Sequence, residues 1–230
     1  MIADFQIEIT ESEVLRRLGY KKKEGLQGKL KEALLEAIDL GNRLAKPRAL
    51  YAWFKIKEAD AQGLLLEEGS RLNIGRAMKL WKGAEYLAVA LCTIGGDLEN
   101  HASELFSKGE PVLASMLDSV GSVAVDSLEA GVGQLICQQA HEPGMRVGPR
   151  LSPGSKDWFL GEQRVLFRLL PAARIGVSLT GHCMMMPRKS LSFCSGAGRE
   201  VVWKGLDSDK VTNPCQLCGM VNCPYRRRGS

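Results

Sequence analysis

The stretch PVLASMLDSVGSVAVDSLEAGVGQLICQQ, residues 111–139, determines the fold expected for this chain. Pro111 suits the first turn of a helix, where its missing N–H would have no intrahelical partner. Apolar residues then recur at helical spacing from about Val112 to Gln139. At 1.5 Å per residue the stretch predicts a helix of about 40 Å, which would form the spine of the domain. Small residues would let neighbouring elements pack closely: Gly121, Ser122, Ala124, Gly131 and Gly133.

Strands are expected both before and after this helix in the sequence. The continuous apolar run from Tyr86 to Ile94 predicts a central strand covered on both faces. Aromatic and β-branched residues in 49–56 predict another strand, and a further one is expected around 191–194. Phe5, Ile7 and Ile9 alternate with polar residues and also indicate a strand. Strands and helices alternate without a βαβ rhythm, so we expect an α+β domain with a twisted antiparallel sheet flanked by helices.

Size and charge limit the classes of function. The 230 residues, 45% of them hydrophobic, suffice for one sizeable core and an appendage. We place a boundary near Gly205, with a single domain over 1–205 and a cysteine-rich tail over 206–230. Much of the net charge of +5 comes from two short basic runs, which we expect to be solvated surface. No run long enough to cross a bilayer and no signal peptide is evident, so the expectation is a cytoplasmic protein that binds neither membrane nor nucleic acid.

Three segments together carry a resemblance to a known family. They are Arg150-Leu151-Ser152-Pro153-Gly154, Met185-Met186-Pro187-Arg188-Lys189-Ser190-Leu191-Ser192, and the central stretch from Leu91 to Ala130. In this order the chain resembles the activation domain of cobalamin-dependent methionine synthase and its free-standing relatives, over roughly residues 1–205. The resemblance implies binding of S-adenosylmethionine and a role in the reductive activation of a corrinoid.

The resemblance also implies a ligand site. Arg150 would bind the ligand carboxylate through two parallel hydrogen bonds. Pro153 and Gly154 would form a turn whose backbone amides approach the ligand. Ser152 and Ser155 lie where further contacts would fall. Ser190 and Ser192 are two residues apart on a strand, so both would face the same groove. The alternatives are an arginine that pairs with a surface acid and an edge strand with solvated hydroxyls.

Methyl transfer from a sulfonium to reduced cobalt needs no general base, and no catalytic constellation is evident among the residues. The resemblance therefore implies an activator that supports reductive remethylation of a separate corrinoid protein. That partner would be a corrinoid-binding protein, or a methionine synthase that lacks its own activation domain, assisted by an electron donor. Whether the chain is itself an enzyme stays open. The alternative is a zinc-stabilised adaptor for protein or nucleic acid that no longer uses S-adenosylmethionine.

The tail carries the sharpest local pattern, Cys215-x-x-Cys218-x-x-x-x-Cys223. Two thiolates at this spacing can hold one metal ion, and a third lies within reach. A fourth ligand is needed, for which Cys194 is the first candidate and Cys183 the second. The metal would be either structural zinc or an iron–sulfur cluster, and the spacing does not distinguish them.

Overall fold

The computed structural model of the chain describes residues 2–3, 5–20, 26–155 and 158–201. One antiparallel sheet runs through the molecule in the order β4-β3-β2-β5-β9-β6, and β1 pairs with β2 beside it. Its strands are β1 (Ile2–Ala3), β2 (Arg48–Ala59), β3 (Gly63–Leu66), β4 (Arg71–Asn73), β5 (Tyr86–Thr93), β6 (Arg146–Val147) and β9 (Ser190–Gly198). A small hairpin joins β7 (Ser178–Leu179) to β8 (Met185–Met186). The predicted α+β class with an antiparallel sheet is confirmed.

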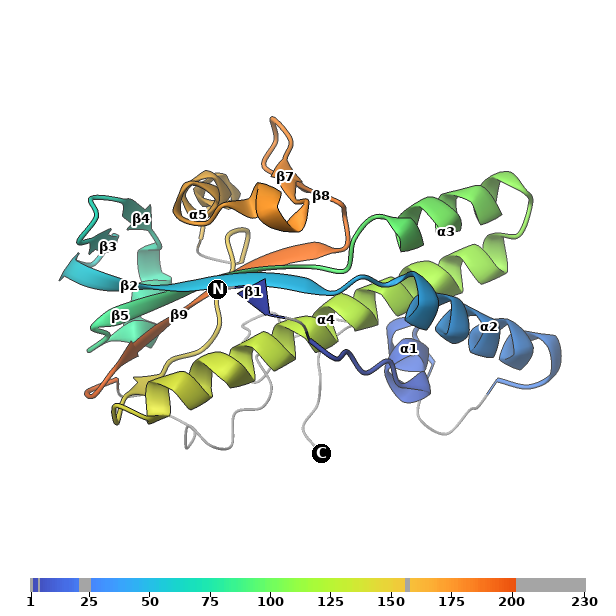
Figure 1. The fold of residues 1–230 in the computed structure, drawn as a ribbon, viewed down its shortest axis with the longest axis horizontal. Helices are drawn as coiled ribbons and strands as arrows, with labels where there is room; N and C mark the ends of the chain where they lie inside the picture. Colours follow the sequence, from blue (N-terminus) through green and yellow to red (C-terminus); the bar gives the residue numbers. More distant parts are fainter. Residues whose placement is uncertain (1, 4, 21–25, 156–157, 202–230) are drawn as a thin grey trace.

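Four helices lie on one face of the sheet and beyond its end. They are α1 (Glu11–Arg17), α2 (Gly28–Leu44), α3 (Asp97–Ser107) and α4 (Pro111–His141). In Figure 1, α4 lies diagonally along the molecule, beneath the sheet and past α3 and α2. Leu117, Val120 and Leu128 of α4 are fully buried in the core that these helices share with the sheet. The predicted spine helix is confirmed, and it forms because its apolar and small residues face both the sheet and the neighbouring helices.

The other face is covered by shorter elements. They are the 3-10 helices η1 (Gly75–Trp81), η2 (Leu160–Glu162) and η3 (Ala172–Ile175), and the helix α5 (Gln163–Leu169). Trp81 and Trp158 meet edge to face there, with ring centroids 6.2 Å apart. The central strand β5 separates the two cores, since its residues alternate between them and seven of its eight residues are buried. This is the doubly covered strand that the apolar run predicts.

Two expectations need correction. Phe5, Ile7 and Ile9 lie outside the strands of the sheet; their side chains pack partly buried against the core around α4, so packing rather than strand pairing explains their alternation. Helix α4 is also long and apolar enough to span a membrane, contrary to the sequence-based expectation. It lies in the core, however, with 56% of its most apolar window buried inside the protein. The proposed boundary near Gly205 falls outside the described residues.

The outer edge of β9 positions the site described next. Its C-terminal half is paired, because β6 lies against Ala197 and Gly198, and Gly148 N–H donates to the Gly196 carbonyl. Leu151 and Cys194 then exchange two backbone hydrogen bonds of 2.9 and 2.8 Å. Beyond Leu151 the chain turns away, and within the described part of the chain no strand pairs with this edge at Ser190–Phe193. The first half of β9 therefore borders an open groove.

Candidate functional site

The groove is about 490 Å³ in volume, a size that suits a small organic ligand. Three segments form its walls: the turn after Arg150, the start of α5, and the chain from Cys183 into β9. Its lining is mostly apolar and includes few polar groups. The lining residues are Ser152, Pro153, Leu160, Gln163, Cys183, Met184, Met185, Met186, Arg188, Ser190, Leu191 and Ser192.

Two of the segments behind the family resemblance thus meet in space. The predicted site residues Ser152 and Pro153 lie on one wall, and Ser190 and Ser192 lie on the other. The two-residue spacing on β9 directs both of these hydroxyls to the side of the sheet that carries α5. The placement of the two serines on one face follows from strand geometry alone.

The deepest polar pair of the groove joins β9 to α5. Ser192 is 2% exposed and Gln163 is 3% exposed, and the Ser192 hydroxyl donates to Gln163 Oε1 over 2.7 Å. Gln163 is the first residue of α5, and the preceding Glu162 fixes this end of the helix to β4. The Glu162 carboxylate accepts hydrogen bonds from the backbone N–H of Asn73 at 2.8 Å and from its side-chain amide at 3.1 Å. Both ends of the Gln163–Ser192 contact are therefore held by the fold.

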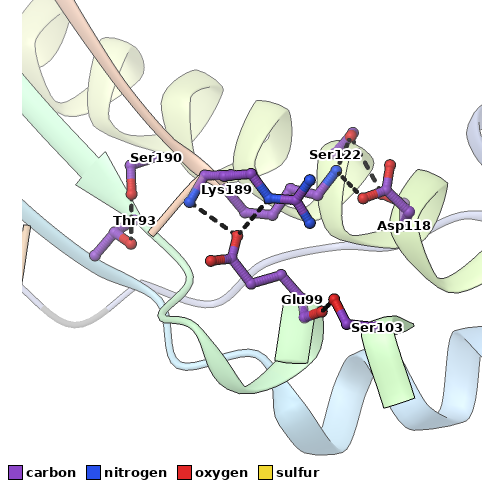
Figure 2. A network of polar contacts seen from close by, with 8 residues as sticks. Thr93, Glu99, Ser103, Asp118, Ser122, Lys189 and Ser190 are labelled. Carbon is purple, nitrogen blue, oxygen red and sulfur yellow. Dashed lines mark hydrogen bonds and ion pairs between the residues drawn. The ribbon is translucent and has the colours of Figure 1, made fainter. Parts of the chain in front are cut away.

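A polar network, shown in Figure 2, fixes the segment that leads into β9. Lys189 Nζ lies 2.8 Å from Asp118 Oδ1 and 2.8 Å from the Ser122 hydroxyl, both on α4. The backbone N–H of Arg188 donates to Glu99 Oε2 on α3 at 2.8 Å, and its side-chain Nε lies 3.6 Å from the same oxygen.

The same figure shows the Ser190 hydroxyl donating to Thr93 Oγ1 on β5, at 2.8 Å. Thr93 is fully buried, so this bond ties the first residue of β9 to the central strand. The wall of the groove is thus connected to α3, α4 and β5. The network holds Arg188 at the rim, where 62% of its side chain is exposed.

The turn after Arg150 has the conformation that its Pro-Gly sequence predicts. Gly154 has φ +92°, a left-handed conformation that glycine adopts without steric cost. Ser155 N–H donates to the Ser152 carbonyl at 3.0 Å, and Gly154 N–H donates to the Trp158 carbonyl at 2.8 Å. Gly154 and Ser155 shape the turn and are not among the residues that line the groove.

Arg150 lies on the opposite side of β9 from the two serines. Its guanidinium carbon is 5.8 Å from the centre of the Phe193 ring, which belongs to the core around α4. Arg150 Nη1 donates to the Glu129 carbonyl at 3.1 Å, and Nε lies 3.3 Å from Glu129 Oε1. The expectation that Arg150 lines the same groove as the serines is therefore corrected. Its partner is an acid on α4, which is the alternative left open by the sequence.

The structure describes Cys194 and Cys183, the two candidates for a fourth metal ligand. Cys194 is fully buried in the apolar core under α5, and burial raises the pKa of its thiol. Its role as a fourth ligand stays a prediction, because the three cysteines it would join lie outside the described residues. Cys183 is 4% exposed and borders the groove with φ +63°. Cys215, Cys218 and Cys223 lie outside the described residues, and no group of three metal-binding side chains occurs among the residues described.

Sequence reasoning did not identify Gln163, Leu160 and Cys183 as part of this groove. Leu160 and Gln163 follow the Pro-Gly turn by fewer than ten residues, but their sequence has only a helical pattern. Their role depends on how α5 packs over β9.

No protein-family model and no curated protein matches the sequence. Among solved structures, the chain is similar to the crystal structure of the MetH reactivation domain bound to AdoHcy. The similarity has a TM-score of 0.58 at 12% sequence identity, and it covers 79% of this chain and 70% of that chain. The two proteins therefore share a fold.

Proposed function

We propose that the chain is an S-adenosylmethionine-binding activator that supports the reductive remethylation of a separate corrinoid protein. The observation that carries the proposal is the groove at the open edge of β9. It joins the Ser152-Pro153 turn to Ser190 and Ser192, the segments on which the family resemblance rests. The similar MetH reactivation domain was solved with AdoHcy, the demethylated product of S-adenosylmethionine.

Within this proposal the groove holds the adenosine end of the ligand. Pro153, Leu160 and Leu191 offer apolar contact surface, and the groove has the volume for a nucleoside. The amino-acid end lies at the adjoining edge of β9, where Arg150 and Glu129 sit side by side. A cation next to an anion complements the carboxylate and ammonium of an amino acid. Arg150 has five N–H donors, so it can bind a carboxylate while its contacts to Glu129 persist.

The bound ligand supplies an electrophilic methyl group, and the acceptor is a reduced corrinoid that the partner carries. The residues of this chain orient the sulfonium and exclude water from it, a positioning role that needs no general base. The exposed Phe159, Met184 and Met186 lie on or near the rim of the groove, at 77%, 59% and 43% exposure. We assign this rim to contact with the corrinoid partner. The tail cysteines Cys215, Cys218 and Cys223 are proposed to hold zinc or an iron–sulfur cluster.

Anaerobic calorimetry with S-adenosylmethionine tests the proposal. The wild-type chain is expected to bind, and Arg150→Ala is expected to weaken binding by about 1.5–3 kcal/mol, the value of a charge-assisted hydrogen bond. Arg168→Ala, which removes an exposed arginine of α5, is the matched control and should bind as the wild type does. Arg188→Ala tests the alternative that Arg188, rather than Arg150, binds the ligand carboxylate. A larger loss of affinity in Arg188→Ala than in Arg150→Ala would place the carboxylate at the rim of the groove.

Absence of binding by the folded wild-type chain would refute the proposal. If that chain also carried one zinc ion, the result would support the adaptor function instead. A folded Arg150→Ala variant that binds as tightly as the wild type would show that Arg150 serves only the structure.

A further inference from the structure

Gln163 combines two properties that its structural role does not require. Its side chain is almost completely buried, yet only one end of its amide bonds to a residue in the described part of the chain. The Ser192 hydroxyl donates to Oε1, whereas Nε2 has no hydrogen-bond partner among the residues that the structure describes. Nε2 is not fully enclosed by protein atoms, so it is open to the groove that Gln163 lines.

Most buried side-chain polar atoms in native proteins have a hydrogen-bond partner, so a donor directed at a groove is available to whatever fills that groove. Here the unpaired donors point into a mostly apolar groove of the size of a small ligand. The Oε1 atom has two lone pairs, and Ser192 occupies one of them. Gln163 therefore presents one acceptor position and an adjacent N–H donor to whatever fills the groove.

An amide that presents a donor next to an acceptor is complementary to one base in particular. Adenine offers an amino donor at N6 beside a ring-nitrogen acceptor, and glutamine binds this edge through two hydrogen bonds. Hypoxanthine has an oxygen in place of the amino group, so the acceptor of the amide would face another acceptor. Leu160, Met185 and Leu191 line the same groove and suit contact with the faces of a flat ring.

We propose that Gln163 is the residue that selects adenine in this groove, and that Ser192 positions it. The inference rests on the proposed function for the nature of the ligand, and it adds which residue recognises the base. The position of Gln163 is fixed before any ligand arrives, because Glu162 ties the start of α5 to Asn73 and Ser192 holds the amide. Preorganisation of this kind favours selectivity over adaptability.

The test compares two ligands that differ only at the base, S-adenosylhomocysteine and S-inosylhomocysteine, by calorimetry on the full chain. The wild type is expected to prefer the adenosyl ligand by about 5- to 150-fold, the range for a two-bond amide–base contact. Gln163→Met keeps the size of the side chain and removes both the donor and the acceptor. It is expected to bind the two ligands with affinities within about threefold of each other. Gln138→Met, at an exposed position of α4, is the control and should keep the wild-type ratio.

Ser192→Ala should lower the ratio without abolishing it, because Gln163 stays in the groove but loses its positioning bond. The double variant Gln163→Met/Ser192→Ala provides the test if Gln163→Met alone fails to fold, since it leaves no buried hydroxyl unpaired. A purely structural role for Gln163 would weaken both ligands equally and leave the ratio unchanged, which would overturn the inference. Equal binding of the two ligands by the wild type would overturn it while leaving the proposed function intact. A wild type that binds neither would refute both.

Discussion

Gly133 of α4 provides a direct test of how Arg150 is packed. A methyl group added at this glycine would overlap Arg150 Nη1 and would come within 3.0 Å of Arg150 Cδ and Cζ. The substitution Gly133→Ala therefore has to displace the guanidinium from α4. Gly131, one half-turn earlier on the same helix, is the matched control, since its added methyl would meet only Phe5 Cδ1 at 3.5 Å, an ordinary contact.

The two substitutions share one effect on stability and differ in another. Replacing a helical glycine by alanine stabilises the folded state by about 1 kcal/mol, because it reduces the backbone freedom of the unfolded chain. At Gly133 the displaced Arg150 also loses its bond to the Glu129 carbonyl, worth about 1.5–3 kcal/mol for a charged donor. Its position over Phe193 is worth about 0.5–1 kcal/mol more, and water compensates part of these losses. Gly133→Ala is therefore expected to be about 1–3 kcal/mol less stable than Gly131→Ala.

Urea denaturation followed by circular dichroism measures this difference. We expect Gly131→Ala to raise the free energy of unfolding above that of the wild type, and Gly133→Ala to leave it equal or lower. The double variant Gly133→Ala/Arg150→Ala completes the cycle, because the penalty at Gly133 should disappear once the arginine is absent. If Gly133→Ala stabilised the chain as much as Gly131→Ala, Arg150 would not lie against α4 and the geometry described for this side of β9 would be wrong.

Two further predictions concern the cysteines. Burial raises the pKa of the Cys92 and Cys194 thiols above the ordinary thiol value of 9.0. Because the same thiols in the unfolded chain ionise near that ordinary value, the stability due to keeping them protonated is complete below this pH. It is lost as the pH rises above it, so the free energy of unfolding should fall between pH 8 and pH 10. A chain in which both are replaced by alanine should show a smaller fall; an equal fall would assign the effect to other groups. In the tail, Cys218→Ser is expected to abolish metal binding, measured by metal analysis of anaerobically purified protein, while calorimetry shows the main thermal transition nearly unchanged. Unfolding of the whole chain by this substitution would place the domain boundary elsewhere.

The sequence by itself determined the features that depend on local periodicity. The helix spine followed from the apolar spacing of 111–139, and the central strand followed from the uninterrupted apolar run before Gly95-Gly96. Thr10, with Glu13 three residues later, has the sequence of a helix N-terminal cap, and its hydroxyl accepts the Glu13 N–H at 3.3 Å. Ser190 and Ser192 were placed on one face because side chains alternate along any strand. Each of these inferences needs only residues within a few positions of one another.

Tertiary structure alone decided how these pieces face one another. Leu151 pairs with Cys194, so Arg150 lies over Phe193 on the α4 side while Ser192 faces α5 on the other side. A pairing shifted by one residue would exchange these faces, and no local pattern specifies which register forms. The same register places Cys194 in the apolar core under α5, away from solvent. It also brings Ser192 to Gln163, 29 residues away, and leaves the outer end of that amide open to the groove. Contacts between distant segments reflect the packing of the whole sheet against its helices, which a single sequence does not reveal.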